Sequence, residues 1–343
     1  MKKLIAVILV CLLAMAAVTG CASQQTDNKK EDSAKSTADS AEKTKISFVL
    51  DWTPNTNHTG LYVAKDKGYF EEAGLDVEIV QPPEDGAEML VGSGKAQFGV
   101  SFQDYLPPAL AGADAIPITA VAALVQHNTS GIISLKGKGI DSPKGLEGKK
   151  YATWDLPIEK ATLKKVVEDD GGDFSKVELI PSTVTDEVSA LQSGTVDAIW
   201  VYYGWAGIAT EQANLETDFF AFKDVDPVFD YYSPVVVGNN TWIEEHPDAT
   251  KAFLSALKKG YEYAIDDPDG AADILLKNAP ELNAEQVKAS QKYLSKEYIS
   301  DAKRWGFIDA ARWSAFFKWI NDNKLSEAEV PENGGFTNEY LPE

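Results

Sequence analysis

A pattern of apolar strands and helical stretches occurs twice in this chain and restricts the folds open to it. Residues 90–100, LVGSGKAQFGV, align with residues 190–200, ALQSGTVDAIW. In both copies a helix ends at Ser-Gly and a buried strand begins shortly afterwards, and an apolar strand precedes each copy at 77–80 and 177–180. Two copies of one unit indicate an α/β protein with largely parallel sheets and two similar lobes. Chance similarity between two Ser-Gly helix ends is the alternative.

Two apolar runs lie where the chain would pass between the lobes, SGIISL at 130–135 and YSPVVVG at 232–238. We expect them to form neighbouring hinge strands. Lobe 1 is then residues 45–138 and 232–343, and lobe 2 is residues 139–231. A helix is expected at 60–73, and lobe 1 ends in a helical tail. Its expected helices, each beginning near a Pro, Asp or Asn as helix N-termini do, are 247–265, 268–277, 284–294 and 310–321.

The first residues predict export. Lys2 and Lys3 precede an apolar run at 4–18, which has the length of a signal peptide and is too short to span a bilayer. The run ends in VTGC at 18–21, which resembles the lipobox of bacterial lipoproteins, so residues 1–21 are expected to be a lipoprotein signal peptide with Cys21 acylated. A plain secretory peptide is the alternative. Residues 22–44 lack aromatic side chains and predict a disordered tether. We therefore expect a protein anchored by lipid to the extracytoplasmic face of the cell membrane.

The amino-acid composition limits which ligands and partners this chain is expected to bind. The chain carries 53 acidic and 32 basic residues, a net charge of −21, which disfavours nucleic acid. Its three histidines are widely separated and no cysteine follows Cys21, so neither a metal site nor a cofactor is expected. Only two arginines are present, Arg304 and Arg312. This scarcity argues against a pocket for a sulfonate or nitrate anion.

Several segments resemble the SsuA/THI5-like (NMT1-like) family. They are LDWTPN at 50–55, His58, AKDKGYFEEAGL at 64–75 and TNEYL at 337–341. The resemblance implies the type II periplasmic-binding-protein fold, two lobes with a hinge of two crossover strands. The family includes bacterial receptors for sulfonates, nitrate and a thiamine pyrimidine precursor, and fungal enzymes that make that pyrimidine. The opening and closing segments are most similar to the thiamine-precursor branch.

This resemblance implies a substrate-binding lipoprotein of an ABC importer, with a permease and its ATPase as partners. The implied ligand is N-formyl-4-amino-5-aminomethyl-2-methylpyrimidine. A receptor for riboflavin, or for a sulfonate or nitrate, is an alternative. A pyrimidine-precursor synthase is a further alternative, but that branch needs a lysine where this chain is aligned to carry Ser101, and it carries a cysteine-rich run that this chain lacks.

An aminopyrimidine pocket needs aromatic surfaces and a carboxylate or amide at the edge of the ring. Asp51 and Trp52 follow the first strand, and Trp154 and Asp155 occupy the matching place in lobe 2. Glu159 lies at the start of the next helix. We expect all five to face the ligand. The alternatives are a surface Asp and a core Trp, and a Glu159 that only complements the helix dipole.

The remaining candidates follow a second strand or come from the family segments. Tyr202, Tyr203, Gly204 and Trp205 follow the strand at 198–201, at the carboxyl end where α/β sheets bind ligands. Part of this group could instead belong to the core. The other candidate ligand-binding residues are His58, Tyr62, Ser101 and Asn338. Tyr62 and Tyr105 are weaker aromatic candidates, and His58 could equally be a structural histidine.

Overall fold

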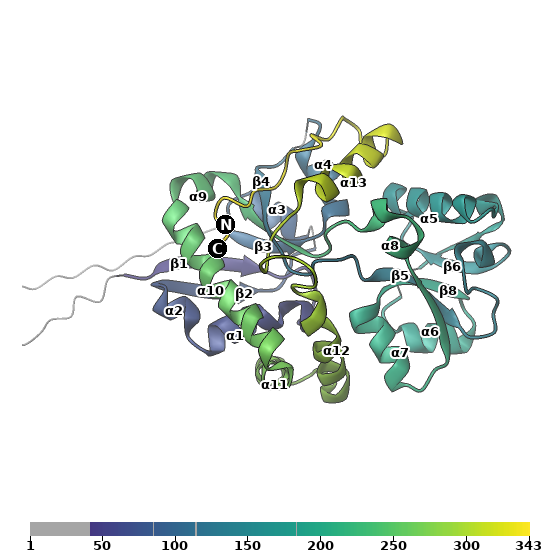
Figure 1. The fold of residues 1–343 in the computed structure, drawn as a ribbon, viewed down its shortest axis with the longest axis horizontal. Helices are drawn as coiled ribbons and strands as arrows, with labels where there is room; N and C mark the ends of the chain where they lie inside the picture. Colours follow the sequence, from purple (N-terminus) through teal and green to yellow (C-terminus); the bar gives the residue numbers. More distant parts are fainter. Residues whose placement is uncertain (1–41, 85, 114, 183) are drawn as a thin grey trace, which may run out of the picture. The chain divides into compact units, whose positions relative to one another are not determined.

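The computed structural model describes residues 42–343 except positions 85, 114 and 183. The signal peptide, Cys21 and most of the tether lie outside the described residues. The described part contains two five-stranded sheets with helices packed around them (Figure 1). None of its helices combines the length and the apolarity that crossing a bilayer requires.

The first sheet has the strand order β2-β1-β3-β10-β4. β1 pairs in parallel with β2 and β3, whereas β10 is antiparallel to both of its neighbours, β3 and β4. The strands are β1 (Thr44–Val49), β2 (Leu75–Val80), β3 (Phe98–Ser101), β4 (Ile118–Ala123) and β10 (Val235–Asn239).

The second sheet repeats this pattern in the order β7-β6-β8-β5-β9. β6 is parallel to β7 and β8, and β5 is antiparallel to β8 and β9. The strands are β5 (Ser130–Leu135), β6 (Lys150–Thr153), β7 (Glu178–Pro181), β8 (Ala198–Tyr202) and β9 (Thr217–Ala221).

The internal repeat predicted from the sequence is confirmed. Helix α3 (Ala87–Gly92) leads into β3, and α6 (Glu187–Ser193) leads into β8 at the same place in the other sheet. Gly94 and Gly194 follow the two helices with φ of 74° and 69°. This left-handed conformation is open to glycine at little cost, so the same residue ends both helices for the same reason.

Two connecting segments, residues 124–129 and 229–234, join the sheets. They run side by side: the Leu124 amide donates to the Pro234 carbonyl at 3.0 Å, and the Asn128 amide group donates to the Phe229 carbonyl at 2.9 Å. The prediction that 130–135 and 232–238 are neighbouring hinge strands is wrong, because β5 and β10 belong to different sheets. β5 is the first strand of the second sheet, which residues 124–129 lead into, and β10 is the last strand of the first sheet, which residues 229–234 lead back to. The lobe boundaries at 138/139 and 231/232 stay predictions. β5, which these boundaries assign to lobe 1, is a strand of the second sheet.

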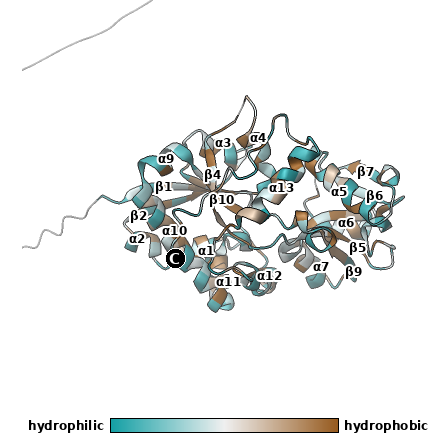
Figure 2. Cartoon of the chain, turned by 45° about the horizontal axis from the view of Figure 1, so that its top comes forward, coloured by the Kyte–Doolittle hydropathy of each residue, from teal (hydrophilic) through white to brown (hydrophobic). Residues whose placement is uncertain are grey.

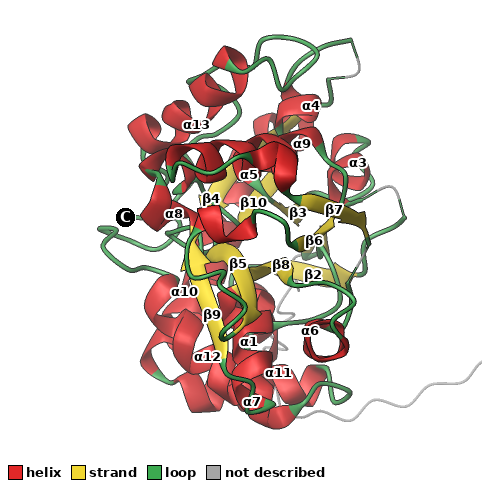
Figure 3. Ribbon diagram, turned by 90° about the vertical axis from the view of Figure 1, so that its right-hand side faces the viewer, coloured by secondary structure: helices red, strands yellow, loops and turns green. Residues whose placement is uncertain are grey.

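Helices cover the sheets, as Figure 3 shows. The predicted helix at 60–73 is two helices, because Gly68 adopts a φ of 76° between α1 and α2. The tail helices agree with prediction, and α10 and α11 each begin at a proline, whose missing N–H costs nothing there. The helices are α1 (Thr59–Asp66), α2 (Tyr69–Glu72), α4 (Pro107–Leu110), α5 (Pro157–Asp169), α7 (Ile208–Gln212), α8 (Phe222–Val225), α9 (Asn240–Glu245), α10 (Pro247–Asp266), α11 (Pro268–Asn278), α12 (Ala284–Glu297) and α13 (Ala310–Asp322).

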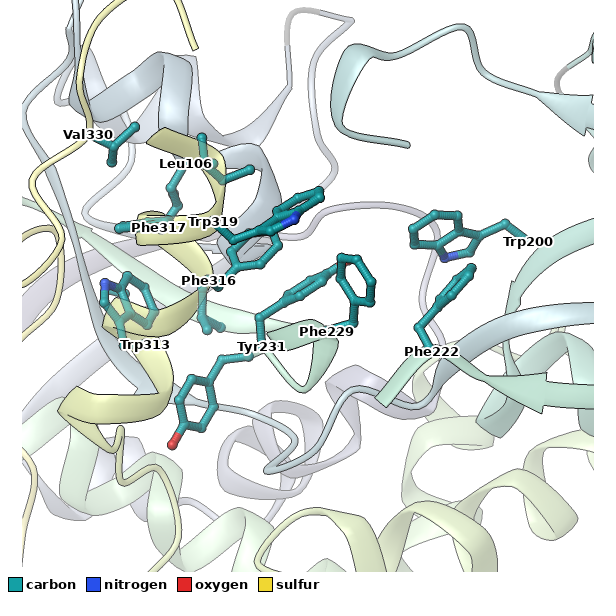
Figure 4. Close-up of a cluster of buried hydrophobic side chains, with 14 of the residues drawn as sticks. Leu106, Trp200, Phe222, Phe229, Tyr231, Trp313, Phe316, Phe317, Trp319 and Val330 are labelled. Atoms are coloured by element: carbon teal, nitrogen blue, oxygen red, sulfur yellow. The ribbon is translucent and has the colours of Figure 1, made fainter. Parts of the chain in front are cut away.

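Hydrophobic residues gather along the buried strands (Figure 2). Aromatic side chains of α13 extend this core to the second connecting segment, as Figure 4 shows. Tyr231 stacks on Phe316 with ring centroids 4.1 Å apart, and Phe229 meets Trp319 edge to face at 5.1 Å. The connecting segment is therefore packed along its length by the tail.

Helix α12 contacts both halves of the described chain. The Ser290 hydroxyl lies 2.5 Å from the Thr56 hydroxyl and donates to the Gly204 carbonyl. The Gln286 amide group donates to the Trp205 carbonyl at 3.4 Å. The C-terminal tail thus holds the π-helix (Tyr203–Gly207) that follows β8 in the second sheet.

Candidate functional site

One cavity of about 660 Å³ is lined by residues from the half of the chain around the first sheet and from the half around the second sheet. Its walls come from α3, from the residues after β3, from the turn after β6 and from the loop that follows α13. β3 and β6 both lie in the parallel part of their sheets, and the carboxyl ends of parallel strands are where open α/β sheets bind ligands. Its ionisable and aromatic lining residues are Glu88, Asp104, Tyr105, Trp154, Glu159, Trp200 and Glu327.

Aromatic rings form much of the cavity wall. Trp154 lies 5.7 Å from Trp200, centroid to centroid, with the ring planes at 47°. Trp200 is buried, but 38% of Trp154 and 45% of Tyr105 are exposed. Large rings left open in a cavity offer apolar surface that a flat ligand can cover.

The charged residues described in the cavity lining are all acidic. Four of its lining residues are acidic, and none of the described lining residues is Lys, Arg or His. Glu88 accepts a hydrogen bond from the Ser101 hydroxyl at 2.5 Å. Burial raises the pKa of Asp104 to about 7, and the charge of Glu88 acts in the same direction. Such a wall suits a neutral or cationic ligand that donates hydrogen bonds, and it repels an anion.

Glu159 is the buried support of the turn after β6. One carboxylate oxygen accepts from the Tyr151 hydroxyl at 2.8 Å and the Trp154 amide at 3.1 Å. The other accepts from the Thr153 hydroxyl at 3.0 Å and the Leu156 amide at 3.2 Å. Although Glu159 lines the cavity, both oxygens are engaged within the protein, so its carboxylate fixes the position of Trp154.

Asp155, between these two residues, does not point its charge at the cavity lining. Its φ is 65°, which is uncommon outside glycine, and its carboxylate pairs with Lys160 at 2.8 Å. The strained backbone at Asp155 turns the chain between β6 and α5. Glu159 holds this turn by the four hydrogen bonds described above.

Asp51 and His58 form a pair, and neither is part of the cavity lining. The His58 ring nitrogen Nε2 lies 2.6 Å from Asp51 Oδ1, and Nδ1 accepts from the Asn55 amide at 3.2 Å. Because Nδ1 is the acceptor, Nε2 carries the proton donated to Asp51. Burial raises the pKa of Tyr105, and the charges of nearby carboxylates, Asp51 among them, act in the same direction. Trp52 is 49% exposed and is not part of the lining.

Tyr202, the last residue of β8, and Tyr203, which follows it, make contacts within the protein. Tyr202 stacks on Phe102 at 5.8 Å, and its hydroxyl accepts from Ser233 at 3.1 Å. Tyr203 donates to Glu211 and packs 5.6 Å from Tyr293. None of these side chains is part of the cavity lining.

Gly204 and Trp205 lie against α12. A β-carbon on Gly204 would approach Leu294 to 2.9 Å, so the glycine is required by close packing. Trp205 packs in a small cluster with Tyr62. The sequence placed Tyr62 and Trp205 in the ligand site, and the structure brings them together outside the cavity lining.

Asn338 and Ser101 make defined contacts within the protein. The Asn338 amide group exchanges two hydrogen bonds with the Ile308 backbone, at 3.0 and 2.8 Å. Ser101 is buried at the end of β3 and reaches the site only through Glu88. Of the residues predicted for the site, Trp154, Glu159 and the weaker candidate Tyr105 line the cavity, and Ser101 contacts its lining.

Sequence reasoning missed Glu88, Asp104, Trp200 and the loop residues near Glu327. Asp104 follows β3 closely, as Asp51 follows β1, and this placement is a signal that could have found it. Trp200 lies inside a buried strand, where an aromatic residue is ordinarily core.

A second hollow of about 780 Å³, here called the hinge-side pocket, lies beside the connecting segments. Several of its charged groups pair with other charged side chains. His127 contacts Asp230 at 2.7 Å and Asp301 at 3.0 Å, and Arg312 lies 3.3 Å from Asp230 and over the ring of Tyr232. Among the described residues no group of three or more metal-ligating side chains is suited to hold an ion.

Comparison with known proteins establishes the fold class. The alkanesulfonate-binding protein SsuA of Xanthomonas axonopodis pv. citri, bound to MOPS, superimposes with a TM-score of 0.65 at 13% identity, over 87% of this chain and 99% of that one. Together with the repeated strand order, this likeness confirms a mixed α/β protein with the type II periplasmic-binding-protein fold.

The family follows from sequence. The family model described as NMT1/THI5 like matches residues 55–271. The formylaminopyrimidine-binding protein of Halalkalibacterium halodurans is 32% identical over 94% of this chain and 96% of its own length. A 4-amino-5-hydroxymethyl-2-methylpyrimidine phosphate synthase of Saccharomyces cerevisiae is 27% identical over 76% of this chain and 80% of its own. This chain belongs to the NMT1/THI5-like family.

Proposed function

We propose that this chain is the substrate-binding component of an ABC importer and that it captures a small aromatic heterocycle. The observation that carries the proposal is the cavity itself: it lies between the two halves, exposes the rings of Trp154 and Tyr105, and has acidic but no basic side chains among its described lining residues. A receptor needs this combination of stacking surface and hydrogen-bond acceptors to hold a flat ring that bears amino groups. A permease and its ATPase would receive the ligand.

The ligand favoured is N-formyl-4-amino-5-aminomethyl-2-methylpyrimidine. Its ring offers a π-face to Trp154, and its exocyclic amine can donate to an acidic wall. The relative from Halalkalibacterium halodurans, named as a formylaminopyrimidine-binding protein, matches this chain over almost its full length. A sulfonate or nitrate would bring a negative charge toward Glu88 and Asp104, which opposes binding.

Isothermal titration calorimetry of the Cys21→Ser protein tests the ligand. The pyrimidine should bind with a stoichiometry of one, whereas taurine and nitrate should give no heat of binding. Binding of riboflavin in place of the pyrimidine would retain the receptor function and change the ligand. Binding of taurine or nitrate alone would overturn the proposed ligand class.

Anchoring is a separate part of the proposal, because Cys21 lies outside the described residues. Acyl chains on Cys21 would supply the membrane affinity. Cys21→Ser should move the protein from the membrane fraction to the medium or periplasm, as followed by fractionation and immunoblotting. A Cys11→Ser variant is the control and should stay with the membrane. If Cys21→Ser stays there too, the chain has another anchor.

The enzyme branch of the family is the competing candidate. The resemblance places its Schiff-base lysine at Ser101, whose hydroxyl donates to Glu88 and carries no amine. None of the described residues that line the cavity is a lysine. Both observations favour binding over synthesis. Incubation with pyridoxal phosphate followed by intact-mass measurement should leave the protein mass unchanged after borohydride reduction, and an adduct on a cavity residue would reopen the enzyme candidate.

A further inference from the structure

Helix α12 joins the two halves of the described chain at a place that is not part of the cavity. The Ser290 hydroxyl donates to the Gly204 carbonyl, and the Gln286 amide group donates to the Trp205 carbonyl at 3.4 Å. Both carbonyls belong to the π-helix that follows β8. π-helices are rare and are frequently found at functional sites. The contact is therefore worth examining for a role in ligand binding.

The other contacts of α12 fix it to the first half. The Tyr298 hydroxyl donates to the Thr56 carbonyl at 2.5 Å, and the Gln291 amide group donates to a carbonyl of α10 at 3.2 Å. At the C-terminal end of the helix, the Glu297 carbonyl accepts from the Gln126 amide of the first connecting segment at 2.9 Å. α12 thus extends from the connecting segment as part of the first half, and it contacts the second half nearer to its N-terminal end.

The cavity, by contrast, has exposed hydrophobic walls on both halves. The first half contributes Met89 and Tyr105 to the lining. The second half contributes Trp154 and Leu156. Of the large hydrophobic side chains that are exposed in the described part of the chain, all but Trp52 belong to this lining. Bringing the two walls together over a ligand would bury these side chains, which is favourable.

The cavity and the α12 contact lie on opposite sides of the strands that the connecting segments reach. Figures 1 and 3 both show α4 and α5, which contribute to the cavity lining, above β5, and α12 and α7 below it. A rotation of one half about the connecting segments that closes the upper side must open the lower side. The two sets of contacts between the halves therefore compete.

We propose that the hydrogen bonds from Ser290 and Gln286 to the π-helix, here called the α12 latch, hold the cavity open and are released when the two halves close on the ligand. The ligand brings together the walls of the cavity, and the rotation exchanges these contacts for those of the latch. This inference rests on the proposed function and adds to it an element, outside the cavity lining, that sets the affinity.

The latch should lower the affinity for the ligand. The ligand binds the closed arrangement, so the apparent affinity is reduced by the fraction of free protein that is closed. Ser290→Ala leaves the Gly204 carbonyl without its buried donor in the open arrangement and changes the closed arrangement little. We therefore expect this variant to bind the ligand roughly threefold to tenfold more tightly, which is the value of one hydrogen bond.

Gly204→Ala tests the same interface through size instead of hydrogen bonding. A β-carbon on Gly204 would approach Leu294 of α12 to 2.9 Å, which pushes the π-helix away from α12 and should also tighten binding. Ser295→Ala is the matched control. Ser295 is a buried serine of the same helix, but its hydroxyl donates to the Lys292 carbonyl of that helix at 3.1 Å. Its replacement should leave the affinity unchanged.

The experiment combines two measurements on the Cys21→Ser protein, on these variants and on the double variant Ser290→Ala/Gly204→Ala. Calorimetric titration with the formylaminopyrimidine gives the affinity per folded molecule, and near-ultraviolet circular dichroism checks the fold. Small-angle scattering gives the radius of gyration with and without the ligand. The radius should fall when the ligand saturates the protein, and the unliganded double variant should already be shifted toward that smaller value.

A purely structural role for α12 would lower stability and leave the affinity per folded molecule unchanged. Unchanged or weaker binding in both Ser290→Ala and Gly204→Ala therefore overturns the inference while leaving the receptor function intact. If the protein without these substitutions binds no pyrimidine, the proposed function fails. The scattering of the unliganded double variant then decides the inference separately, because a radius equal to that of the protein without these substitutions overturns the latch.

Discussion

The cavity and the hinge-side pocket are of similar size, but they differ in whether their acidic side chains are paired with basic ones. Around the hinge-side pocket, His127, Asp230, Asp301 and Arg312 are paired with one another. In the cavity, acidic groups gather without a cation among the described lining residues. Paired charges hold a structure together, whereas unpaired ones beside open aromatic surface are ready for a ligand.

A substitution of Glu159 should have the largest effect on stability. Glu159 lines the cavity, but both of its carboxylate oxygens accept hydrogen bonds from within the protein. Glu159→Ala leaves two amides and two hydroxyls without their acceptor, so we expect a loss of about 3 kcal/mol in the free energy of unfolding. Urea denaturation measures it. Affinity should fall as well, since Trp154 loses its fixed position. If stability is unchanged and only affinity falls, Glu159 contacts the ligand as the sequence predicted.

On the hinge side, Asp230→Asn should be the next largest effect. The carboxylate receives His127, Arg312 and the Asn128 amide, and its loss leaves a half-buried cation cluster uncompensated. We expect a destabilisation of about 2 kcal/mol with ligand affinity per folded molecule unchanged. Asp224→Asn, which removes only an exposed pair with Lys223, is the control. A large loss of affinity in Asp230→Asn would break the comparison, because it would tie the pocket to ligand binding.

Trp154→Ala should weaken ligand binding by about 1–2 kcal/mol, the value of stacking on one aromatic surface. Stability should change little, because the ring is partly exposed. Trp52→Ala should cost less, since Trp52 is not part of the lining. Calorimetric titration of both variants orders them. Equal losses would bring Trp52 into the site as the sequence predicted.

The smallest expected effect is the pH dependence contributed by His127. The hydrogen bond to Asp230 raises the pKa of His127, with burial acting against it. Because the folded state favours the protonated form, this stabilisation is complete below the pKa of an unfolded histidine, near 6.5, and is lost as pH rises through the folded value. We expect the free energy of unfolding to fall by less than about 1 kcal/mol between about pH 7 and about pH 9.

His127→Gln should flatten this dependence. Asp104 does not interfere in that range, because its raised pKa of about 7 makes stability fall with rising pH mainly between the pKa of an unfolded aspartate, about 4, and 7. Urea denaturation at several pH values measures both slopes. A His127→Gln protein with an unchanged slope above neutral pH would show that another group titrates there.

The parts of the fold that the sequence predicts well are those set by local chemistry. The Ser-Gly helix ends, the prolines that begin α10 and α11, and the repeat all depend on a few adjacent residues. The pairing of β5 and β10 was mispredicted because it depends on where each connecting segment enters a sheet. The contacts of Glu159 depend on the turn at Asp155, and those of Gly204 on the approach of α12. Neither could be found without tertiary structure.

The place of β10 has a consequence for the order in which the two sheets can form when the chain emerges from its N-terminus. β10 fills the gap between β3 and β4, yet it follows every strand of the second sheet in the chain. The second sheet is complete once residue 221 has emerged, whereas the first must wait for residue 239 with two strand edges unpaired. Unpaired edges are sites of aggregation. A chain that stops emerging after β9 therefore carries one finished half and one exposed half.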